Sequence, residues 1–334
     1  MNNKVSVILL NYNSWKDTVE CIDSLLQSSY ENFNIIVVDN CSSDDSIEKI
    51  SQYLKMGRLS LENHNYNFKD KYTILNYDGS NFSIEEIKNE SRVYFIKNSS
   101  NGGFSKGNNI GLKFCESKLN SKYYWILNND TIVDRYAIEN LILFSESNNN
   151  DGFIGATILE YYNPKTIQCT CGAKYYKAFT ISKNCNEGKS IDEIDSLTES
   201  SNFISGCSIF GHKSLFLKVN NLSEDYFLYF EELDLMQKAN RHNIKKKWAK
   251  NVYVYHKEGA SIGSENIQHK KSLLSEYYSN YSCLTYNHKF YKKSYKLYAF
   301  NRFILKSIKF ILCKNFEHLK IMKKAYKDFF AKVE

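Results

Sequence analysis

The chain has 334 residues, of which 43% are hydrophobic and 24% charged, as is ordinary for a globular protein with a substantial core. Its nine cysteines are scattered, its first apolar run covers only residues 5–10, and no apolar run approaches the roughly 20 residues that span a bilayer. These features exclude a disulfide scaffold and an integral membrane protein, and they predict a cytoplasmic protein without a secretory leader. The formal charge of +7 is uneven, because lysines crowd the segment after residue 288.

Apolar runs and amphipathic helical patterns alternate along the first 130 residues. We expect strands at residues 5–10, 33–38, 93–96 and 123–127, and helices at 14–28, from 44, and at 103–115. Ser14 is the expected N-cap of the first helix. This rhythm predicts an α/β fold with a doubly wound, mostly parallel sheet that binds a ligand beyond the carboxyl ends of its strands.

The polar segment 57–92 interrupts the rhythm and is interpreted as a surface insertion, not a core element. Further along we expect a helix at 136–146, a hairpin at 175–181, a buried strand at 203–210, a helix at 227–241 and a strand at 252–255. From about residue 277 the pattern is helical, aromatic and basic. We therefore divide the chain into a domain of residues 1–270 and a helical extension of residues 271–334.

Oxygen-bearing side chains follow the expected strand at 123–127. Asn128 and Asp130 are two residues apart, so on an extended chain they point to the same side and could share one divalent cation. Mg²⁺ and Mn²⁺ prefer such ligands together with substrate phosphates. Asn and Asp also close ordinary turns, so this pattern alone leaves a plain turn as the alternative.

Seven short motifs occur in an order that is typical of one enzyme family. They are Asn11-Tyr12-Asn13; Asp39-Asn40-Cys41-Ser42-Ser43-Asp44; Asn101-Gly102-Gly103-Phe104 with Gly107, Asn108, Asn109 and Gly111; Asn128-Asn129-Asp130; Ser205-Gly206; Phe230-Glu231-Glu232-Leu233-Asp234; and His256 with Gly259 and Ser261. Over roughly residues 4–265 the chain thereby resembles the family-2 glycosyltransferases, and among them the bacterial rhamnosyltransferase-like group.

The resemblance implies a GT-A-type fold that transfers a sugar from a UDP-linked or dTDP-linked donor to an acceptor hydroxyl, with inversion at the anomeric carbon. Asp39 matches the position that contacts the nucleotide base, although it could also be an ordinary acid at the start of a helix. The other residues that the resemblance assigns to the donor are Asn11, Asn13, Ser42, Asn101, Gly102, Gly103, Asn109, Asn128 and Asn129. The glycine spacing satisfies neither a dinucleotide fingerprint nor a P-loop.

Asn128-Asn129-Asp130 stands where the family has Asp-x-Asp, which implies Mn²⁺ or Mg²⁺ on Asp130 and Asn128, with His256 completing the metal shell or touching the diphosphate. Asn128 removes one charge, so weaker cation binding is expected. A lone histidine can equally be structural.

The acids at the start of the helix expected at 227–241 supply the catalytic base. The resemblance and the helix pattern together favour Glu232 as the base with Glu231 beside it, although the family usually has Asp where Glu232 stands. Asp234, four residues before Lys238, is predicted to be structural.

Leu305, Ile308, Ile311 and Leu312 recur at helical spacing among lysines. Such a helix either lies on an anionic membrane surface or packs on the catalytic core with its lysines in solvent.

The resemblance implies a glycan or lipid-linked glycan acceptor, a role in bacterial surface polysaccharide or lipooligosaccharide synthesis, and a peripheral place on the inner face of the cell membrane. The departures at Asn128 and Glu232 leave open a catalytically silent module that binds sugar nucleotides or glycans. Nucleic-acid binding would explain only the basic tail, so no nucleic-acid partner is expected.

Overall fold

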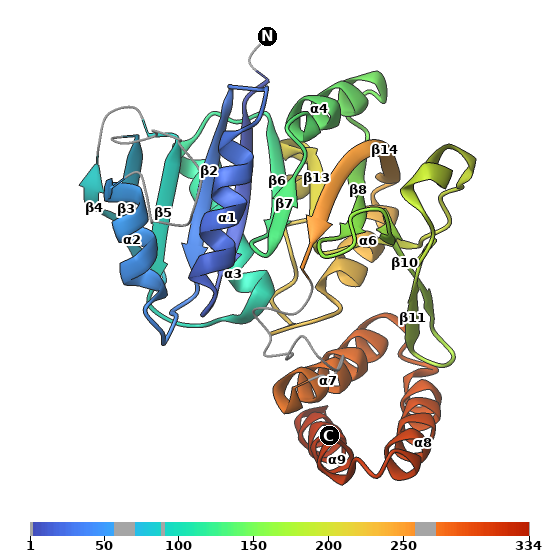
Figure 1. The fold of residues 1–334 in the computed structure, drawn as a ribbon. Coiled ribbons are helices and arrows are strands. Elements are labelled where there is room, and N and C mark those ends of the chain that lie inside the picture. The colour runs from blue at the N-terminus through green and yellow to red at the C-terminus, as the bar shows by residue number, and fades with distance from the viewer. Residues whose placement is uncertain (1–2, 57–70, 88–90, 258–271, 334) are drawn as a thin grey trace.

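The computed structural model describes residues 3–56, 71–87, 91–257 and 272–333. Through this part of the chain runs an 11-stranded mixed sheet, with helices on both faces and three C-terminal helices beside it (Figure 1). The strand order is β4-β3-β5-β2-β1-β6-β13-β8-β14-β7, and β9 pairs with β8. The predicted doubly wound α/β architecture with a helical C-terminal extension is confirmed.

The half of the sheet built from the first third of the chain is parallel, apart from the edge strand β4, and its central strands are buried on both faces. Its elements are β1 (Val5–Asn11), α1 (Trp15–Leu26), β2 (Phe33–Asp39), α2 (Ser46–Met56), β3 (Tyr72–Tyr77), β4 (Phe82–Ile87), β5 (Val93–Asn98), α3 (Gly103–Lys118) and β6 (Tyr123–Asn128). Neighbouring side chains on a strand point to opposite faces, so Val7 packs in the layer of α1 and α2 while Ile8 packs in the layer of α3. This two-sided burial explains why the strands are continuous apolar runs.

The other half of the sheet reverses direction. Its elements are β7 (Thr131–Val133), α4 (Ala137–Ser147), β8 (Gly152–Glu160), β9 (Ile167–Thr170), β13 (Ser208–His212), α5 (Lys213–Lys218), α6 (Glu231–Arg241) and β14 (Lys245–His256). Strand β13 is antiparallel to β6 and β8, and β14 is parallel to β8. The end of β14 therefore lies at the same sheet edge as the ends of β1, β2 and β6, and so does the start of α6, which leads back toward the start of β14.

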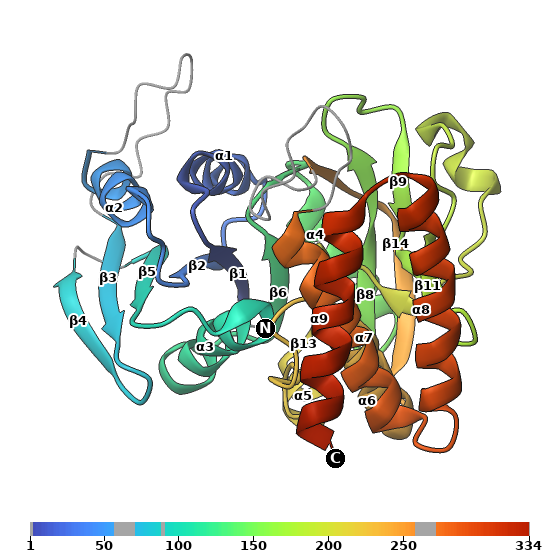
Figure 2. The ribbon, with the colours of Figure 1, turned by 90° about the horizontal axis from the view of Figure 1, so that it is seen from below.

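A small sheet and a helical bundle complete the described fold. The small sheet holds β10 (Gly172–Tyr176), β11 (Ile181–Asn184) and β12 (Phe203–Ile204), and a 3-10 turn η1 (Ile191–Ser196) lies between β11 and β12. The bundle consists of α7 (Leu273–Phe290), α8 (Tyr295–Leu312) and α9 (Phe316–Val333), which share a core around Leu284, Phe310 and Phe329. Figure 2 shows the three helices standing together on the side of β8, β14 and α6, away from β3 and β4.

The interpretation of residues 57–92 as a surface insertion is wrong for its second half. Strand β3 is largely buried and pairs in parallel with β5, and β4 closes that edge of the sheet. The cause is that Ile74 and Leu75 bury their side chains although the surrounding sequence is polar. Residues 57–70 lie outside the described part, and the domain boundary near residue 270 stays a prediction, because residues 258–271 are not described.

Two other predicted elements differ from the structure. The run 203–210 is two strands, β12 and β13, separated by a turn at residues 205–207. The helix expected from residue 227 begins only at Glu231, because Tyr229 and Phe230 have φ values of 69° and 74°, which no α-helix contains. All nine cysteines are described and unpaired, as expected. Among the described helices, none is both long and apolar enough to cross a membrane.

Candidate active site

Asn11, Asp39 and Ser42 form one hydrogen-bonded cluster where β1 and β2 end. Asn11 Nδ2 donates to Asp39 Oδ1 over 2.7 Å, and the Ser42 hydroxyl donates to the same oxygen over 2.6 Å. The Ser42 amide donates to Asp39 Oδ2, and Asn13 reaches the same loop through the Ser42 and Ser43 groups. The structure thus brings together four of the residues that the sequence assigned to the donor. The Asp39 carboxylate is fully buried and fixes this loop.

Asn129 joins this cluster from the end of β6. Its Nδ2 donates to the Thr18 hydroxyl, which donates to Asn11 Oδ1 over 2.7 Å. Thr18, on α1, was not singled out from the sequence, because a threonine inside a helix carries no signal of its own. It connects the ends of β1 and β6.

The loop at Asn101 and Gly103 is fastened to the residue after Asp39. Asn40 Nδ2 donates to Asn101 Oδ1 and to the Gly103 carbonyl, and Asn101 Oδ1 also accepts from the Gly103 amide. Gly103 has φ 83°, and a Cβ there would lie 2.1 Å from the Phe227 carbonyl oxygen. Glycine is required at this position by contact with protein, and the diphosphate contact assigned to the loop stays a prediction.

Asn109 does not join the cluster. Its side chain exchanges two hydrogen bonds with the Leu222 backbone and a third with Glu224, so it holds the loop after α5. Gly107 and Gly111 are likewise explained by packing, because a Cβ on either would lie within 2.6 Å of Leu10 or Ile8 on β1.

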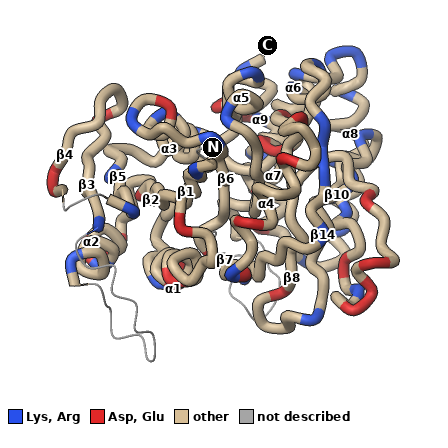
Figure 3. Tube along the Cα trace, turned by 90° about the horizontal axis from the view of Figure 1, so that it is seen from above, with Lys and Arg blue, Asp and Glu red and all other residues tan. Residues whose placement is uncertain are grey.

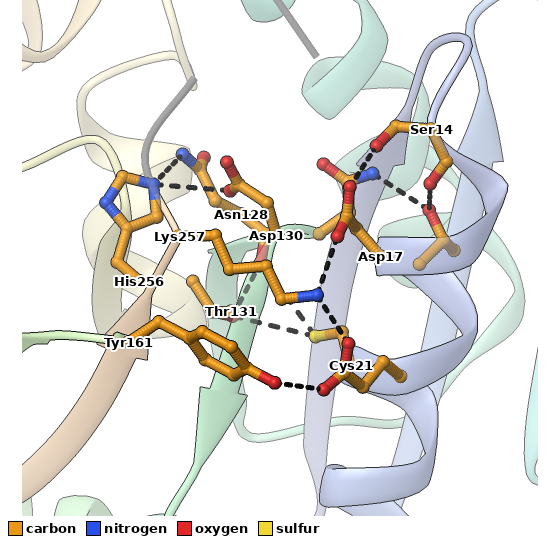
Figure 4. A network of polar contacts seen from close by, with 12 residues as sticks. Ser14, Asp17, Cys21, Asn128, Asp130, Thr131, Tyr161, His256 and Lys257 are labelled. Carbon is orange, nitrogen blue, oxygen red and sulfur yellow. Dashed lines mark hydrogen bonds and ion pairs between the residues drawn. The ribbon is translucent and has the colours of Figure 1, made fainter. Parts of the chain in front are cut away.

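Asn128, Asp130 and His256 meet on the other side of the β6 end (Figure 4). His256 Nε2 lies 3.2 Å from Asp130 Oδ1 and 3.5 Å from Asn128 Nδ2, and its Nδ1 lies 2.9 Å from Gln168 Oε1. Burial lowers the pKa of His256, but Cys207 and Asp130 outweigh it and raise this pKa well above its ordinary value. Burial raises the pKa of Asp130, but His256 more than offsets this and lowers it.

The three residues predicted to bind a cation lie together in the structure, and cation binding by them stays a prediction. Asp130 Oδ1 is buried and accepts no regular hydrogen bond from the described residues, its ion-pair partner being the His256 ring. A carboxylate, an amide oxygen and an imidazole are ligand types that suit Mn²⁺ or Mg²⁺. Gln168 orients the imidazole from behind, as groups behind a metal-bound histidine do. No sequence signal marked Gln168.

Lys257 ties this corner to α1 (Figure 4). Its ammonium group contacts Asp17 Oδ1 at 2.7 Å and the Glu20 carboxylate, while its backbone amide donates to the Asp130 carbonyl. Tyr161 donates to the other oxygen of Glu20. Burial lowers the pKa of Lys257, but the two carboxylates raise it overall, so the lysine stays charged. Its place directly after His256 was the only sequence signal for it.

Glu231 and Glu232 begin α6 at the same sheet edge. One oxygen of each carboxylate is buried without a hydrogen-bond partner in the described residues. Burial and then the charge of Glu232 raise the pKa of Glu231 well above its ordinary value, and burial raises that of Glu232 to about 7. Glu231 is 5% exposed whereas Glu232 is more accessible, so Glu232 is the carboxylate that an incoming molecule can reach. One shared proton at neutral pH is what two adjacent buried acids require.

A strained turn delivers this pair. Tyr229 and Phe230 are both in the left-handed region, a conformation that costs of order 1–3 kcal/mol per residue outside glycine. Tyr229 is held by a 2.6 Å hydrogen bond to Ser275, and Phe230 packs on Tyr175 and Tyr286. The Phe104 amide, next to Gly103, donates to the Phe227 carbonyl over 2.8 Å. The glycine loop and the glutamate pair are thus joined through main chain.

Asp234 is structural, as expected, but its predicted partner is wrong. It is fully buried and binds Lys289 of α7 at 2.6 Å and the Tyr226 hydroxyl at 2.9 Å. Lys238 instead donates to the Asn221 carbonyl, because α7 brings a closer cation to the carboxylate than the helix itself does.

The model of the family described as Glycosyl transferase family 2 matches residues 6–73 and 65–192, which together cover more than half of the chain. The chain belongs to glycosyl transferase family 2. This family-2 segment contains the Asp39 cluster, the glycine loop and Asp130, whereas Glu232 and His256 lie after it. Membership is confirmed, and the rhamnosyltransferase-like subgroup stays a prediction.

Two curated relatives of this family-2 chain are themselves named as glycosyltransferases. Glycosyltransferase GlyG of Streptococcus pneumoniae serotype 4 is 25% identical over 163 residues, covering 49% of this chain and 40% of the relative. The low-salt glycan biosynthesis hexosyltransferase Agl10 of Haloferax volcanii is 23% identical over 169 residues, covering 50% and 52%. The chain spans about half the length, or less, of these relatives.

Solved structures agree on the fold. S. aureus TarS 1–349 in complex with UDP-GlcNAc matches with a TM-score of 0.53 at 16% identity, over 98% of this chain and 80% of that one. GalNAc-T7 with UDP, GalNAc and Mn²⁺ matches with a TM-score of 0.58 at 14% identity, over 88% and 49%. At these identities the likeness establishes the GT-A-type fold of the family-2 chain.

Proposed function

We propose that this family-2 chain is an active, inverting glycosyltransferase that moves a sugar from a nucleoside diphosphate to an acceptor hydroxyl. The observation that carries the proposal is the Glu231–Glu232 pair. Each carboxylate has one buried oxygen without a hydrogen-bond partner among the described residues, and the pair lies at the sheet edge where β1, β2 and β6 end in Asn11, Asp39 and Asn128. Acids with strongly perturbed pKa values cluster at functional sites, which supports this role for the pair.

In this proposal the two groups of residues at the sheet edge bind different parts of the donor. The cluster of Asn11, Asn13, Asp39 and Ser42 holds the nucleotide, and Asp130, Asn128 and His256 hold a divalent cation. When bound, the cation neutralises the diphosphate as the glycosidic bond breaks. The UDP-GlcNAc in the TarS structure and the UDP in the GalNAc-T7 structure support a UDP-linked donor, with a dTDP-linked donor as the alternative.

Glu232 takes the proton of the acceptor hydroxyl in the proposed reaction. The oxygen attacks the anomeric carbon from the face opposite the diphosphate, the new glycosidic bond forms as the carbon–oxygen bond to the diphosphate breaks, and the proton stays on Glu232. A pKa of about 7 leaves about half of Glu232 ionised, and so able to accept a proton, at neutral pH. Glu231, with the higher pKa, is the proton-bearing neighbour.

The acceptor in this proposal is a glycan or a lipid-linked glycan of a bacterial surface polysaccharide or lipooligosaccharide. One relative, the low-salt glycan biosynthesis hexosyltransferase Agl10, supports a hexosyltransferase role of this kind. In this proposal the protein works in the cytoplasm, peripheral on the inner face of the cell membrane.

The test is a pair of measurements on wild type and Glu232→Gln. A thermal-shift screen against UDP-, dTDP- and GDP-sugars, with Mn²⁺ or with EDTA, should raise the melting temperature of both proteins equally with one nucleotide and only when Mn²⁺ is present. Donor hydrolysis and transfer should fall in Glu232→Gln on the order of 10² to 10⁴-fold. Glu187→Gln, on the exposed turn after β11, is the matched control and should keep full activity. Full activity in Glu232→Gln would refute the assignment, and a wild type that binds donor but never turns it over would favour the silent module.

A further inference from the structure

Helix α8 presents a continuous apolar face to the outside. Seven large side chains on it are between 40% and 77% exposed: Leu297, Phe300, Ile304, Leu305, Ile308, Ile311 and Leu312. At roughly 100° per residue they fall within an arc of roughly 140°. The opposite side of the helix, with Ala299 and Phe310, packs into the bundle core. The alternative in which this stripe packs on the catalytic core is therefore wrong, and a continuous exposed apolar face of this kind marks an interaction site.

The charged residues on helix α8 itself have one sign. Helix α8 contains no Asp or Glu, and exposed Lys296 and Lys309 lie at the two borders of the arc. Exposed Lys293 and Lys314 extend the basic rim beyond the helix ends. Lysine and arginine positions recur along and beside α8 in Figure 3. An apolar band between lysines complements anionic lipid, whereas docking of a second copy through this face would set lysine against lysine.

The face is held in place by the helix's buried side. Arg302, 7% exposed, donates to Asn280 and Ser279 of α7 and to the Thr180 carbonyl in the turn between β10 and β11. Asn301 donates to the Ala178 carbonyl of the same turn over 3.0 Å. Figure 1 shows the β10–β11 hairpin reaching α8. Phe179, at the tip of this turn, is 52% exposed and adds an aromatic ring beside the helix.

We propose that α8 lies in the surface of an anionic bilayer, with its apolar arc in the boundary between headgroups and acyl chains and its bordering lysines on the lipid phosphates. Binding of α8 to the membrane would bring the active site to a lipid-linked acceptor. This purpose rests on the proposed function. Binding itself requires neither donor nor turnover and can be measured without them.

The experiment is co-sedimentation of the full chain with vesicles of phosphatidylcholine alone and of phosphatidylcholine with phosphatidylglycerol. A triple variant, Phe300→Gln, Ile308→Gln and Ile311→Gln, removes apolar surface from the face. Its matched control, Leu143→Gln, Tyr162→Gln and Leu217→Gln, changes three similarly exposed side chains on other elements. A third variant, Lys296→Gln with Lys309→Gln, tests charge alone.

Wild type and the matched control should bind anionic vesicles, and the α8 triple variant should bind at least about tenfold more weakly. The lysine variant should lose about fivefold per lysine on anionic vesicles only, and salt should weaken wild type in the same way. Equal binding by the α8 triple variant and the matched control would overturn the proposal. It would also be overturned if wild type ignored vesicles and formed a dimer that the α8 variant did not form. Because all variants keep the donor site, an unchanged donor-induced thermal shift separates loss of lipid binding from failure of the proposed function.

Discussion

At the scale of single residues, the proposed acid–base chemistry rests on two adjacent carboxylates at the start of α6. Burial raises the pKa of Glu232 to about 7, and burial together with the Glu232 charge raises that of Glu231 further. We assign the first ionisation of the pair to Glu232, because Glu231 also experiences the repulsion of the Glu232 charge. Their neutral forms are favoured in the folded state, so the stability linked to them is present below pH 4.5 and is lost as the pH rises through about 7.

From this order of ionisation we predict that kcat/KM rises with pH through an acidic limb near 7, since a base must be deprotonated to act. Glu231→Gln, which imitates the protonated neighbour, should leave the position of the limb unchanged. The measurement is a pH–rate profile at saturating Mn²⁺ for both proteins. A limb that disappears in Glu231→Gln but persists in Glu232→Gln would exchange the two roles.

At the scale of elements, the glycine loop and the segment before α6 are in close backbone contact. Gly103 combines φ 83° with a Cβ position 2.1 Å from the Phe227 carbonyl oxygen, whereas Gly188 has φ 78° and open space around it. A comparison of Gly103 with Gly188 therefore distinguishes the cost of backbone strain from the cost of a steric clash.

We predict that Gly103→Ala lowers the free energy of unfolding by about 3 kcal/mol or more, because strain and overpacking add. Gly188→Ala should cost only about 1 kcal/mol, from strain alone. Urea unfolding of both variants, read from the same spectroscopic signal, tests this. Similar losses in the two would show that the Phe227 contact relaxes without cost.

The elements that could be predicted from the sequence are those whose hydrophobic pattern directly reflects their burial. Continuous apolar runs indicated β1, β2 and β6, and the polar residues after them indicated the site edge. Strand β3 was missed because its neighbours are polar and only tertiary pairing with β5 buries it. The late start of α6 could not be foreseen, since nothing about Tyr229 or Phe230 favours a left-handed conformation. Gln168 and Thr18 act through partners more than 80 and 100 residues away in sequence, respectively, which no local pattern contains.

At the scale of the whole molecule, one buried arginine links the bundle to the small sheet. Arg302 donates hydrogen bonds to α7 and to the β10–β11 turn, and helix α8 itself contains no carboxylate. Its hydrogen bonds are to neutral oxygens, so its charge is stabilised by geometry that a shorter or apolar side chain cannot reproduce.

We predict that Arg302→Met frees the β10–β11 turn and α8 together while leaving the main sheet folded, since the lost donors leave several buried oxygens unsatisfied. Hydrogen exchange followed by mass spectrometry should show faster exchange in α8 and the hairpin, and unchanged exchange in β1 and β6. Lys309→Met, on the exposed side of the same helix, is the control and should change neither region. Uniformly faster exchange across the sheet would contradict a local role.

The hydrogen bond from the Phe104 amide to the Phe227 carbonyl has a consequence for redesign. Segments 101–104 and 227–232 meet through backbone atoms, so neither can be exchanged for the matching segment of a relative without disturbing the other. A chimera built to alter sugar preference should therefore carry both segments from one parent. A graft of only one segment would place backbones from two different parents in direct contact, without the match that each has with its own partner segment.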